Sequence, residues 1–217
     1  MRATRYWRGR IARHVVLAGC ALATGALFYF LTPPPDVRHR LSMGSAYAAL
    51  LFFGVSLAVG PWNVLRENSN PVSFDLRRDI GIWAGLLGVF HTVVGLTVHL
   101  RGRMWMYFFK QIHPLRIQNS NFGLANFTGI VATFILLLLL AISNDFSLRR
   151  LGRGTWKNLQ RTTYAAFVLT AVHGVAYQMI EKRQIAFRLV LVAVIVGIVI
   201  LQVGAFRYRR RAAVIST

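Results

Sequence analysis

The sequence predicts an all-α integral membrane protein, a bundle of six transmembrane helices with both termini in the cytoplasm. Hydrophobic residues make up 55% of the 217 residues. Six runs contain no Asp, Glu, Lys or Arg and are each 18 residues or longer: 14–35, 41–65, 80–100, 117–144, 162–180 and 189–206. Because about 20 apolar residues cross the hydrocarbon layer of a bilayer as a helix, each run is long enough for one span.

These runs predict helices at about 14–32, 44–64, 79–100, 123–142, 159–180 and 188–206. The first follows an Arg-rich segment and ends in Thr32-Pro33-Pro34-Pro35 without a small-residue cleavage pattern, so it is expected to be a retained span rather than a secretion signal. The later helices are bounded by charged residues such as Arg66, Asp79 and Arg207. No linker or change of composition divides the chain, which predicts a single domain over residues 1–217.

The distribution of the basic residues predicts the orientation. With the N-terminus inside, 17 of the 26 Lys and Arg residues fall in the cytoplasmic segments 1–13, 66–78, 149–161 and 207–211. Only 9 fall in the outer segments 38–40, 101–116 and 182–188. This excess follows the positive-inside rule. A net charge of +20 also raises the question of nucleic acid, but charges placed between apolar runs favour contacts with anionic lipid headgroups, and no nucleic-acid partner is expected.

Several kinds of chemistry are excluded by what the sequence lacks. Cys20 is the only cysteine, so disulfides within the chain, iron–sulfur ligation and CxxC redox chemistry are not possible. No Gly-rich nucleotide loop or Walker motif is present. The six acidic residues are all expected in loops or at helix ends, whereas a proton- or cation-coupled transporter typically keeps a carboxylate near the midplane. Any chemistry must therefore use the helices, the loops or a separate partner.

Two histidines inside the apolar runs are the strongest functional candidates, because an ionisable residue is costly in a membrane. His91 lies about 18 Å from the cytoplasmic end of the third predicted helix, and His173 lies about 21 Å along the fifth. These helices run in the same direction, so the two imidazoles are expected at nearly the same height. Facing imidazoles at matched depth can ligate one haem iron from both sides. The plainer alternative is that each histidine hydrogen-bonds to a neighbouring helix.

Residues near the outer ends of these helices are candidates for holding a cofactor in place. His99 is expected on the same helix face as His91, where it can ligate a second haem, hydrogen-bond a haem propionate or serve as an interfacial polar residue. Arg101 and Arg103 are candidate propionate partners, since a guanidinium pairs well with a carboxylate. The connection 101–122 mixes aromatic and basic residues, which is typical of the membrane interface and also of a docking surface.

With these residues in place, the chain resembles the ferric reductase-like transmembrane family, and within it most closely the haem-binding membrane subunits of bacterial periplasmic methionine sulfoxide reductase systems. The resemblance rests on Arg77-Arg78-Asp79-Ile80-Gly81-Ile82-Trp83 leading to His91, and on Leu151-Gly152, Trp156 and Leu159 leading through Tyr164 to His173. It covers about half of the chain. It implies b-type haem held by His91 and His173.

Two departures from the family pattern bear on the number of haems. Many members carry a histidine early in the fifth helix, where this chain has Gln160. Members similar to NADPH oxidases carry a second ligand on the third helix, where this chain has Met104 and Trp105. One haem is therefore expected rather than a stacked pair.

The resemblance implies a membrane cytochrome of the bacterial inner membrane that passes electrons to a periplasmic acceptor, expected to be a methionine sulfoxide reductase catalytic subunit. The electron donor is expected to be a cytoplasmic flavin reductase or the quinol pool, and a bound flavin or quinone stays open. An alternative is a stand-alone ferric or other metal reductase, or a quinol-linked cytochrome. An alternative of another class is a haem-free scaffold or transporter.

Overall fold

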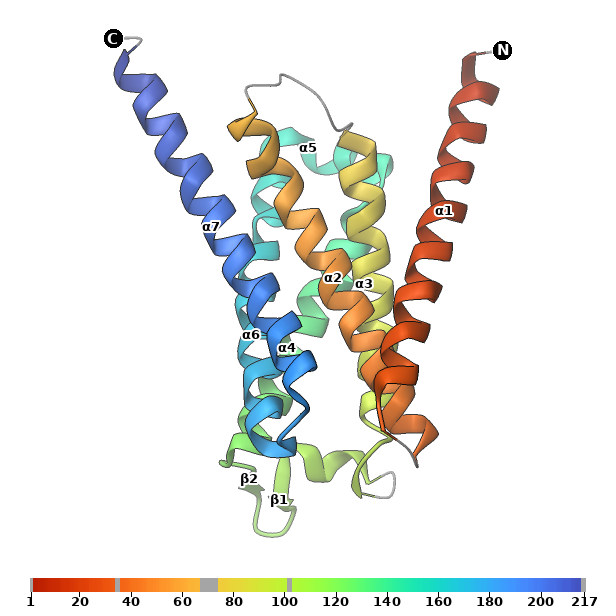
Figure 1. The fold of residues 1–217 in the computed structure, drawn as a ribbon, viewed down its shortest axis with the longest axis vertical. Helices are drawn as coiled ribbons and strands as arrows, with labels where there is room; N and C mark the ends of the chain where they lie inside the picture. The colour runs from red at the N-terminus through yellow and green to blue at the C-terminus, as the bar shows by residue number, and fades with distance from the viewer. Residues whose placement is uncertain (1, 34–35, 67–73, 101–102, 216–217) are drawn as a thin grey trace.

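The computed structural model describes residues 2–33, 36–66, 74–100 and 103–215. Over these ranges the fold is almost entirely helical (Figure 1). Seven α-helices are present: α1 (Arg2–Leu31), α2 (Val37–Leu65), α3 (Phe74–Gly95), α4 (Asn121–Ile142), α5 (Asp145–Gln160), α6 (Thr162–Glu181) and α7 (Ile185–Ile215). Between α3 and α4 lie the short 3-10 helix η2 (Met104–Tyr107) and an antiparallel hairpin of β1 (Phe109–Gln111) and β2 (Arg116–Ile117).

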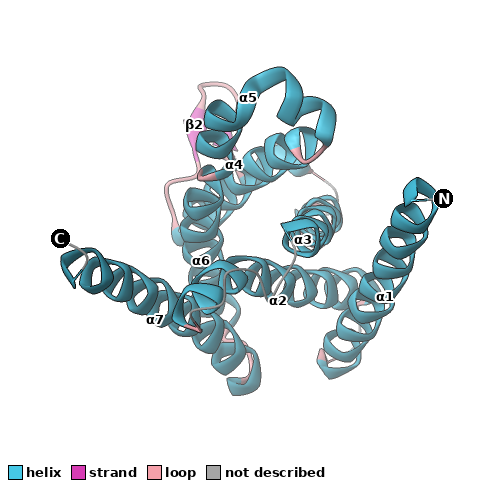
Figure 2. Ribbon diagram, turned by 90° about the horizontal axis from the view of Figure 1, so that it is seen from above, coloured by secondary structure: helices cyan, strands magenta, loops and turns pink. Residues whose placement is uncertain are grey.

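The helices form a bundle whose two ends differ. Both chain termini and α5 lie at one end, and the β1–β2 hairpin lies at the other (Figure 1). Helix α2 packs against α1, α3 and α7, while α4 packs against α3 and α6. Helices α1 and α7 lean away from the others, as the view along the bundle shows (Figure 2). Helices α3 and α6 both run from the end with the termini towards the hairpin end, in the same direction, as predicted.

Five helical segments among the described residues are long and apolar enough to cross a membrane: Trp7–Leu31, Val37–Leu65, Asn121–Ile142, Asp145–Glu181 and Ile185–Ala212. Helices α1 and α7 present large apolar side chains outwards, such as Leu22, Phe30 and Ile200. Such a surface is stable only against lipid or another apolar partner. The prediction of an all-α membrane protein is confirmed. Helix α3 is not among the five, since its first turns carry Asp75, Arg77, Arg78 and Asp79.

Several predicted helix boundaries differ from the structure. Helix α2 begins at Val37 rather than near residue 44, and α3 begins at Phe74 rather than at residue 79. Helix α1 begins at Arg2 rather than near residue 14, and α7 continues to Ile215 rather than 206. Arginine is a good helix former, so a basic flank need not end a helix. Helix α3 stops at Gly95 rather than near residue 100, which moves His99 off the helix.

The sequence does not predict helix α5, because residues 143–158 lie between two of the predicted spans. It is the most amphipathic helix of the chain and lies across the end of the bundle (Figure 1). Asn144 caps it by accepting a hydrogen bond from the backbone N–H of Ser147, and Gly152 kinks it with φ 73°. The indole N–H of Trp156 donates to the carbonyl oxygen of Ile142 at 2.9 Å, which attaches α5 to the end of α4.

The prediction that every acidic residue lies in a loop or at a helix end is wrong for Asp79. This residue lies inside α3, and no part of it is exposed. Its carboxylate contacts Arg10 and Arg13 of α1 at 3.4 and 3.1 Å. A buried charge is stable only when it is paired in this way, so the ion pairs fasten α1 to α3.

Candidate functional site

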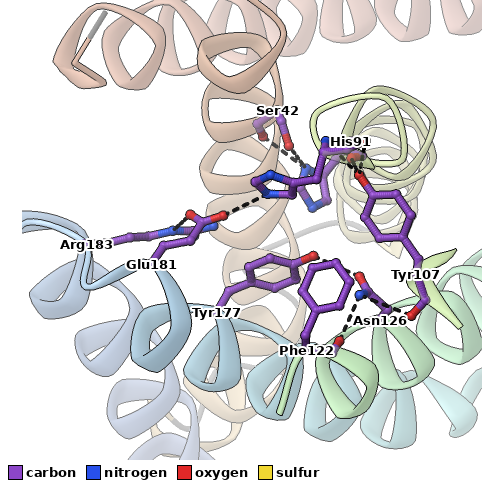
Figure 3. Close-up of polar contacts among 10 residues, drawn as sticks. Ser42, His91, Tyr107, Phe122, Asn126, Tyr177, Glu181 and Arg183 are labelled. Carbon is purple, nitrogen blue, oxygen red and sulfur yellow. Dashed lines mark hydrogen bonds and ion pairs between the residues drawn. The ribbon is translucent and has the colours of Figure 1, made fainter. Parts of the chain in front are cut away.

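The two predicted histidines line one cavity of about 150 Å³ between α2, α3, α4 and α6. Most of its lining is apolar, with residues such as Leu50, Phe53 and Leu136. Polar side chains gather towards the hairpin end of the bundle, where Tyr107, Glu181 and Arg183 lie (Figure 3). A mainly apolar cavity with a few converging polar groups is the usual form of a cofactor site.

His91 extends from α3 towards α2, where its ring is anchored through one nitrogen. The Nδ1 atom lies 3.0 Å from the carbonyl oxygen of Ser42 and 3.3 Å from its hydroxyl (Figure 3). A carbonyl oxygen only accepts, so Nδ1 must carry the proton to make this bond. The other ring nitrogen, Nε2, then has a free lone pair.

His173 is anchored in the same way from α6 onto α4. Its Nδ1 atom donates to the carbonyl oxygen of Ala125 at 2.7 Å. The ring lies directly against the backbone of Gly129, where an added Cβ would come within 2.5 Å of Nδ1. Any larger residue at position 129 would push the imidazole away. Glycine at this position thus fixes where the ring sits.

The two imidazoles lie 6.0 Å apart between ring centroids, with an angle of 78° between their planes. Within the described ranges, neither Nε2 has a hydrogen-bond partner. A histidine that ligates a metal usually donates its other N–H to a carbonyl or carboxylate, which is the arrangement seen at both rings. The structure therefore brings His91 and His173 together, as their matched depth predicts.

The donor set fits haem better than a bare metal ion. No group of three or more His, Cys, Asp or Glu side chains that could hold a metal occurs in the described part of the chain. Two neutral imidazoles alone leave most coordination positions of an ion unfilled. A macrocycle that supplies four equatorial nitrogens leaves two axial positions, and histidine is a common axial ligand.

Tyr107 explains why α3 ends early. Its side chain, only 1% exposed, donates its hydroxyl hydrogen to the carbonyl oxygen of Gly95 at 3.1 Å and accepts from the backbone N–H of His99 at 2.8 Å. Burial raises the pKa of this phenol above its usual value, which keeps the donated proton in place. The helix end is thus capped by a residue from the following connection. No pattern in the sequence indicates this contact.

His99, freed from the helix, pairs with an acidic residue of α6. Its Nε2 atom lies 3.2 Å from Oε1 of Glu181, and the Nε–H of Arg183 donates to Oε2 of the same carboxylate at 2.8 Å. All three residues line the cavity, and the side chains of Glu181 and Arg183 are each 16% exposed. The prediction that His99 lies on the same helix face as His91 is wrong, because α3 ends at Gly95. Both residues nevertheless line the same cavity.

Among the described residues, the arginine that lines the cavity is Arg183 and not the predicted Arg103. Arg101 lies outside the described residues, and Arg103 is exposed and does not line the cavity. Arg183 does, and its guanidinium also lies 5.5 Å from the ring centroid of Tyr177. The sequence does not indicate a role for Arg183, because this residue follows the end of α6 and basic residues commonly flank membrane spans.

Comparison with known proteins identifies the class. The family described as the ferric reductase like transmembrane component matches residues 43–171, which contain most of α2, all of α3 to α5 with His91, and the first half of α6. His173 lies two residues beyond the matched range. The chain therefore belongs to this family, and the predicted resemblance is confirmed.

Among relatives, the chain is similar to the protein-methionine-sulfoxide reductase heme-binding subunit MsrQ of Salmonella enteritidis PT4. The two are 26% identical over 180 residues, which cover 82% of this chain and 78% of the relative. No solved structure is significantly similar to the chain. Together with the apolar helices, these matches indicate a multi-pass inner-membrane protein, as predicted.

Proposed function

We propose that this chain is the haem-binding membrane subunit of an electron-transfer system, with one b-type haem held between His91 and His173. The observation that carries the proposal is the pair of anchored imidazoles, each with Nδ1 bonded to a carbonyl oxygen and Nε2 unbonded within the described residues. Support comes from the family match and from the haem-binding relative.

When bound, haem would supply one-electron redox chemistry, and the chain would set its position and surroundings. Ser42 and Ala125 hold the two rings by their carbonyl oxygens, and Gly129 fixes the place of His173. Two histidines would fill both axial positions, which suits electron transfer better than binding of oxygen. Arg183 and His99, at the hairpin end of the cavity, would hold the haem carboxylates.

The proposed topology is a single domain over residues 1–217 with both termini in the cytoplasm. It has six spans, because α3 crosses the membrane in addition to the five apolar segments. The basic residues support this orientation. The Arg-rich start of α1, the Arg-rich end of α7 and the basic helix α5 all lie at the same end of the bundle (Figure 1). The donor would be a cytoplasmic flavin reductase or the quinol pool. The acceptor would be a periplasmic methionine sulfoxide reductase catalytic subunit, following the name of the relative.

The test is the reduced-minus-oxidised spectrum of the purified protein together with its haem content. We expect a six-coordinate b-type spectrum, and loss of most of the haem in both His91→Ala and His173→Ala. His113→Ala is the matched control, because His113 is exposed next to the hairpin and should leave the spectrum unchanged. Absence of haem in the unaltered protein, or full haem content in both cavity variants, would falsify the proposal.

The acceptor is tested separately, by mixing the reduced protein with a periplasmic methionine sulfoxide reductase catalytic subunit. Reoxidation that depends on both the subunit and its sulfoxide substrate supports this partner. Reoxidation by ferric chelates alone would instead favour the stand-alone metal reductase.

A further inference from the structure

The cluster of charges that joins α1 to α3 contains more positive than negative charge. Arg10 Nη2 lies 3.4 Å from Asp79 Oδ1, and Arg13 Nε lies 3.1 Å from Asp79 Oδ2. Two guanidinium groups therefore share one carboxylate. Since Asp79 has no exposed surface, it is already committed to these partners.

His14 adds a donor to this cluster but no charge. The indole N–H of Trp83 donates to His14 Nδ1 at 3.2 Å, so Nδ1 must be the unprotonated nitrogen. Nε2 then carries the single ring proton and points to Asp79 Oδ1 at 3.5 Å. A neutral histidine leaves the excess of positive charge unchanged.

A third guanidinium lies on the neighbouring face of α3. Arg78 Nη1 donates to Asp145 Oδ1 of α5 at 2.6 Å, and the Arg78 side chain is 7% exposed. Arg10 and Arg149 are also close enough to act on the charge of Asp145. The N-terminal turns of α3 thus contact two arginines of α1 and carry Arg78, which is paired with the first residue of α5.

Among the described residues, two nitrogen atoms of this cluster have no hydrogen-bond acceptor. They are Nη2 of Arg13 and Nε of Arg78, both buried. A buried donor of a charged group that lacks a partner is costly, and such groups are normally satisfied by protein, water or a ligand. In the described part of the chain, the three arginines thus share two carboxylates, and two of them keep a buried nitrogen without an acceptor.

We propose that Arg10, Arg13 and Arg78 form a phosphate-binding site, whose ligand is the phosphodiester of an anionic phospholipid. Phosphate offers several oxygens to guanidinium forks, which bind it in bidentate fashion. The site lies near the end of the bundle that carries α5 and the termini (Figure 1). Arg149, Arg150 and Arg153 of α5 add exposed positive charge there. The Arg13 side chain, 32% exposed, gives a headgroup access to the cluster.

The experiment uses the full chain in detergent, with phosphatidylglycerol, phosphatidylcholine or inorganic phosphate added as separate probes. Thermal unfolding and the lipid retained in native mass spectra are the readouts. We expect phosphatidylglycerol to raise the unfolding temperature more than phosphatidylcholine does. Each of Arg13→Gln and Arg78→Gln should bind it about fivefold more weakly, as expected for losing one basic contact to an anionic surface.

Arg8→Gln is the matched control, since Arg8 is exposed on the same helix and its loss changes the net charge equally. Its lipid binding should stay within twofold of the unaltered protein. Asp79→Asn provides a second control, because it frees two arginines while weakening the ion pairs: we expect lower stability but undiminished lipid binding.

Equal phosphatidylglycerol binding by the Arg8, Arg13 and Arg78 variants would overturn the proposal, as would loss of lipid binding in Asp79→Asn in parallel with its stability. Stabilisation by inorganic phosphate alone, abolished in Arg13→Gln, would support the phosphate site and overturn its assignment to a lipid. None of these readouts depends on haem.

Discussion

Two of the buried polar sites of the molecule use their hydrogen-bonding groups in opposite ways. In the cavity, His91 and His173 each use one ring nitrogen for a backbone carbonyl oxygen and leave the other without a partner in the described residues. At the opposite end, Asp79 uses both carboxylate oxygens on arginines and a histidine of α1. The histidines are oriented and still available, whereas the carboxylate is fully occupied.

This contrast separates residues placed for a ligand from residues placed for packing. Both kinds of burial carry a cost, and only the ion pairs of Asp79 recover it within the protein. Each anchored imidazole keeps the lone pair of Nε2 unused, which is favourable only if a ligand binds at that nitrogen. Substitutions at the two places should therefore have opposite signatures: stability changes at Asp79, and haem binding changes at the histidines.

The largest effect on stability is expected for Asp79→Asn. Removing one partner of a buried ion pair typically costs about 3–5 kcal/mol, and the lower end applies because Arg13 is partly exposed and can reach water. The free energy of unfolding should fall by about 3 kcal/mol. Haem per folded molecule should stay unchanged, because Asp79 does not line the cavity.

Denaturant titration and haem content of the folded fraction measure the two quantities independently. Glu181→Gln is a useful comparison, since this carboxylate does border the cavity. A variant of Asp79 that keeps its stability but loses haem would show that the two places are coupled, and the contrast between them would no longer hold.

The sequence was sufficient for the features that depend on local pattern. Uncharged runs of 18 or more residues located all six predicted helices, and counting along them placed His91 and His173 at one height. The uncharged runs do not predict α5, because Arg149, Arg150 and Arg153 interrupt its apolar residues and lower the mean hydropathy of the segment. A test for helical periodicity in that window could have found it.

What the sequence could not provide are pairings between distant residues. Glu181 meets His99 across 82 positions, and Tyr107 ends α3 by contacts that arise only once the connection folds back. Asp79 was placed at a helix boundary because charged residues usually bound a span. Its burial depends on α1 continuing as a helix as far as Arg10 and Arg13, which uncharged runs do not reveal.

The next largest effect is expected for Gly129→Ala, which tests whether the position of His173 matters. The added methyl group would come within 2.5 Å of Nδ1 and displace the ring. Overpacking of this kind costs about 1–3 kcal/mol. We expect loss of the six-coordinate spectrum in most molecules, with Gly154→Ala as control, because nothing lies within 4 Å of that position. An unchanged spectrum would mean that Gly129 does not determine the position of the His173 ring.

A smaller effect is expected for Tyr107→Phe, which removes a hydroxyl from the hairpin end of the cavity. The bonds to Gly95 and His99 are lost, and a buried acceptor and donor remain without their partner. This should cost about 1–3 kcal/mol of stability. Because His99 would become more mobile, we expect a shifted haem midpoint potential but normal haem content. Loss of haem would instead assign Tyr107 a direct role in holding the cofactor.

The smallest effect is expected for Ser42→Ala, which tests how His91 is held. The variant removes the hydroxyl at 3.3 Å and keeps the carbonyl oxygen at 3.0 Å from Nδ1. Loss of one secondary hydrogen bond should cost about 0.5–1.5 kcal/mol. Haem content should be unchanged, and the midpoint potential should move less than in Tyr107→Phe. A large change in potential would show that the hydroxyl, and not the backbone, orients His91, so that the two histidines would be anchored by different means.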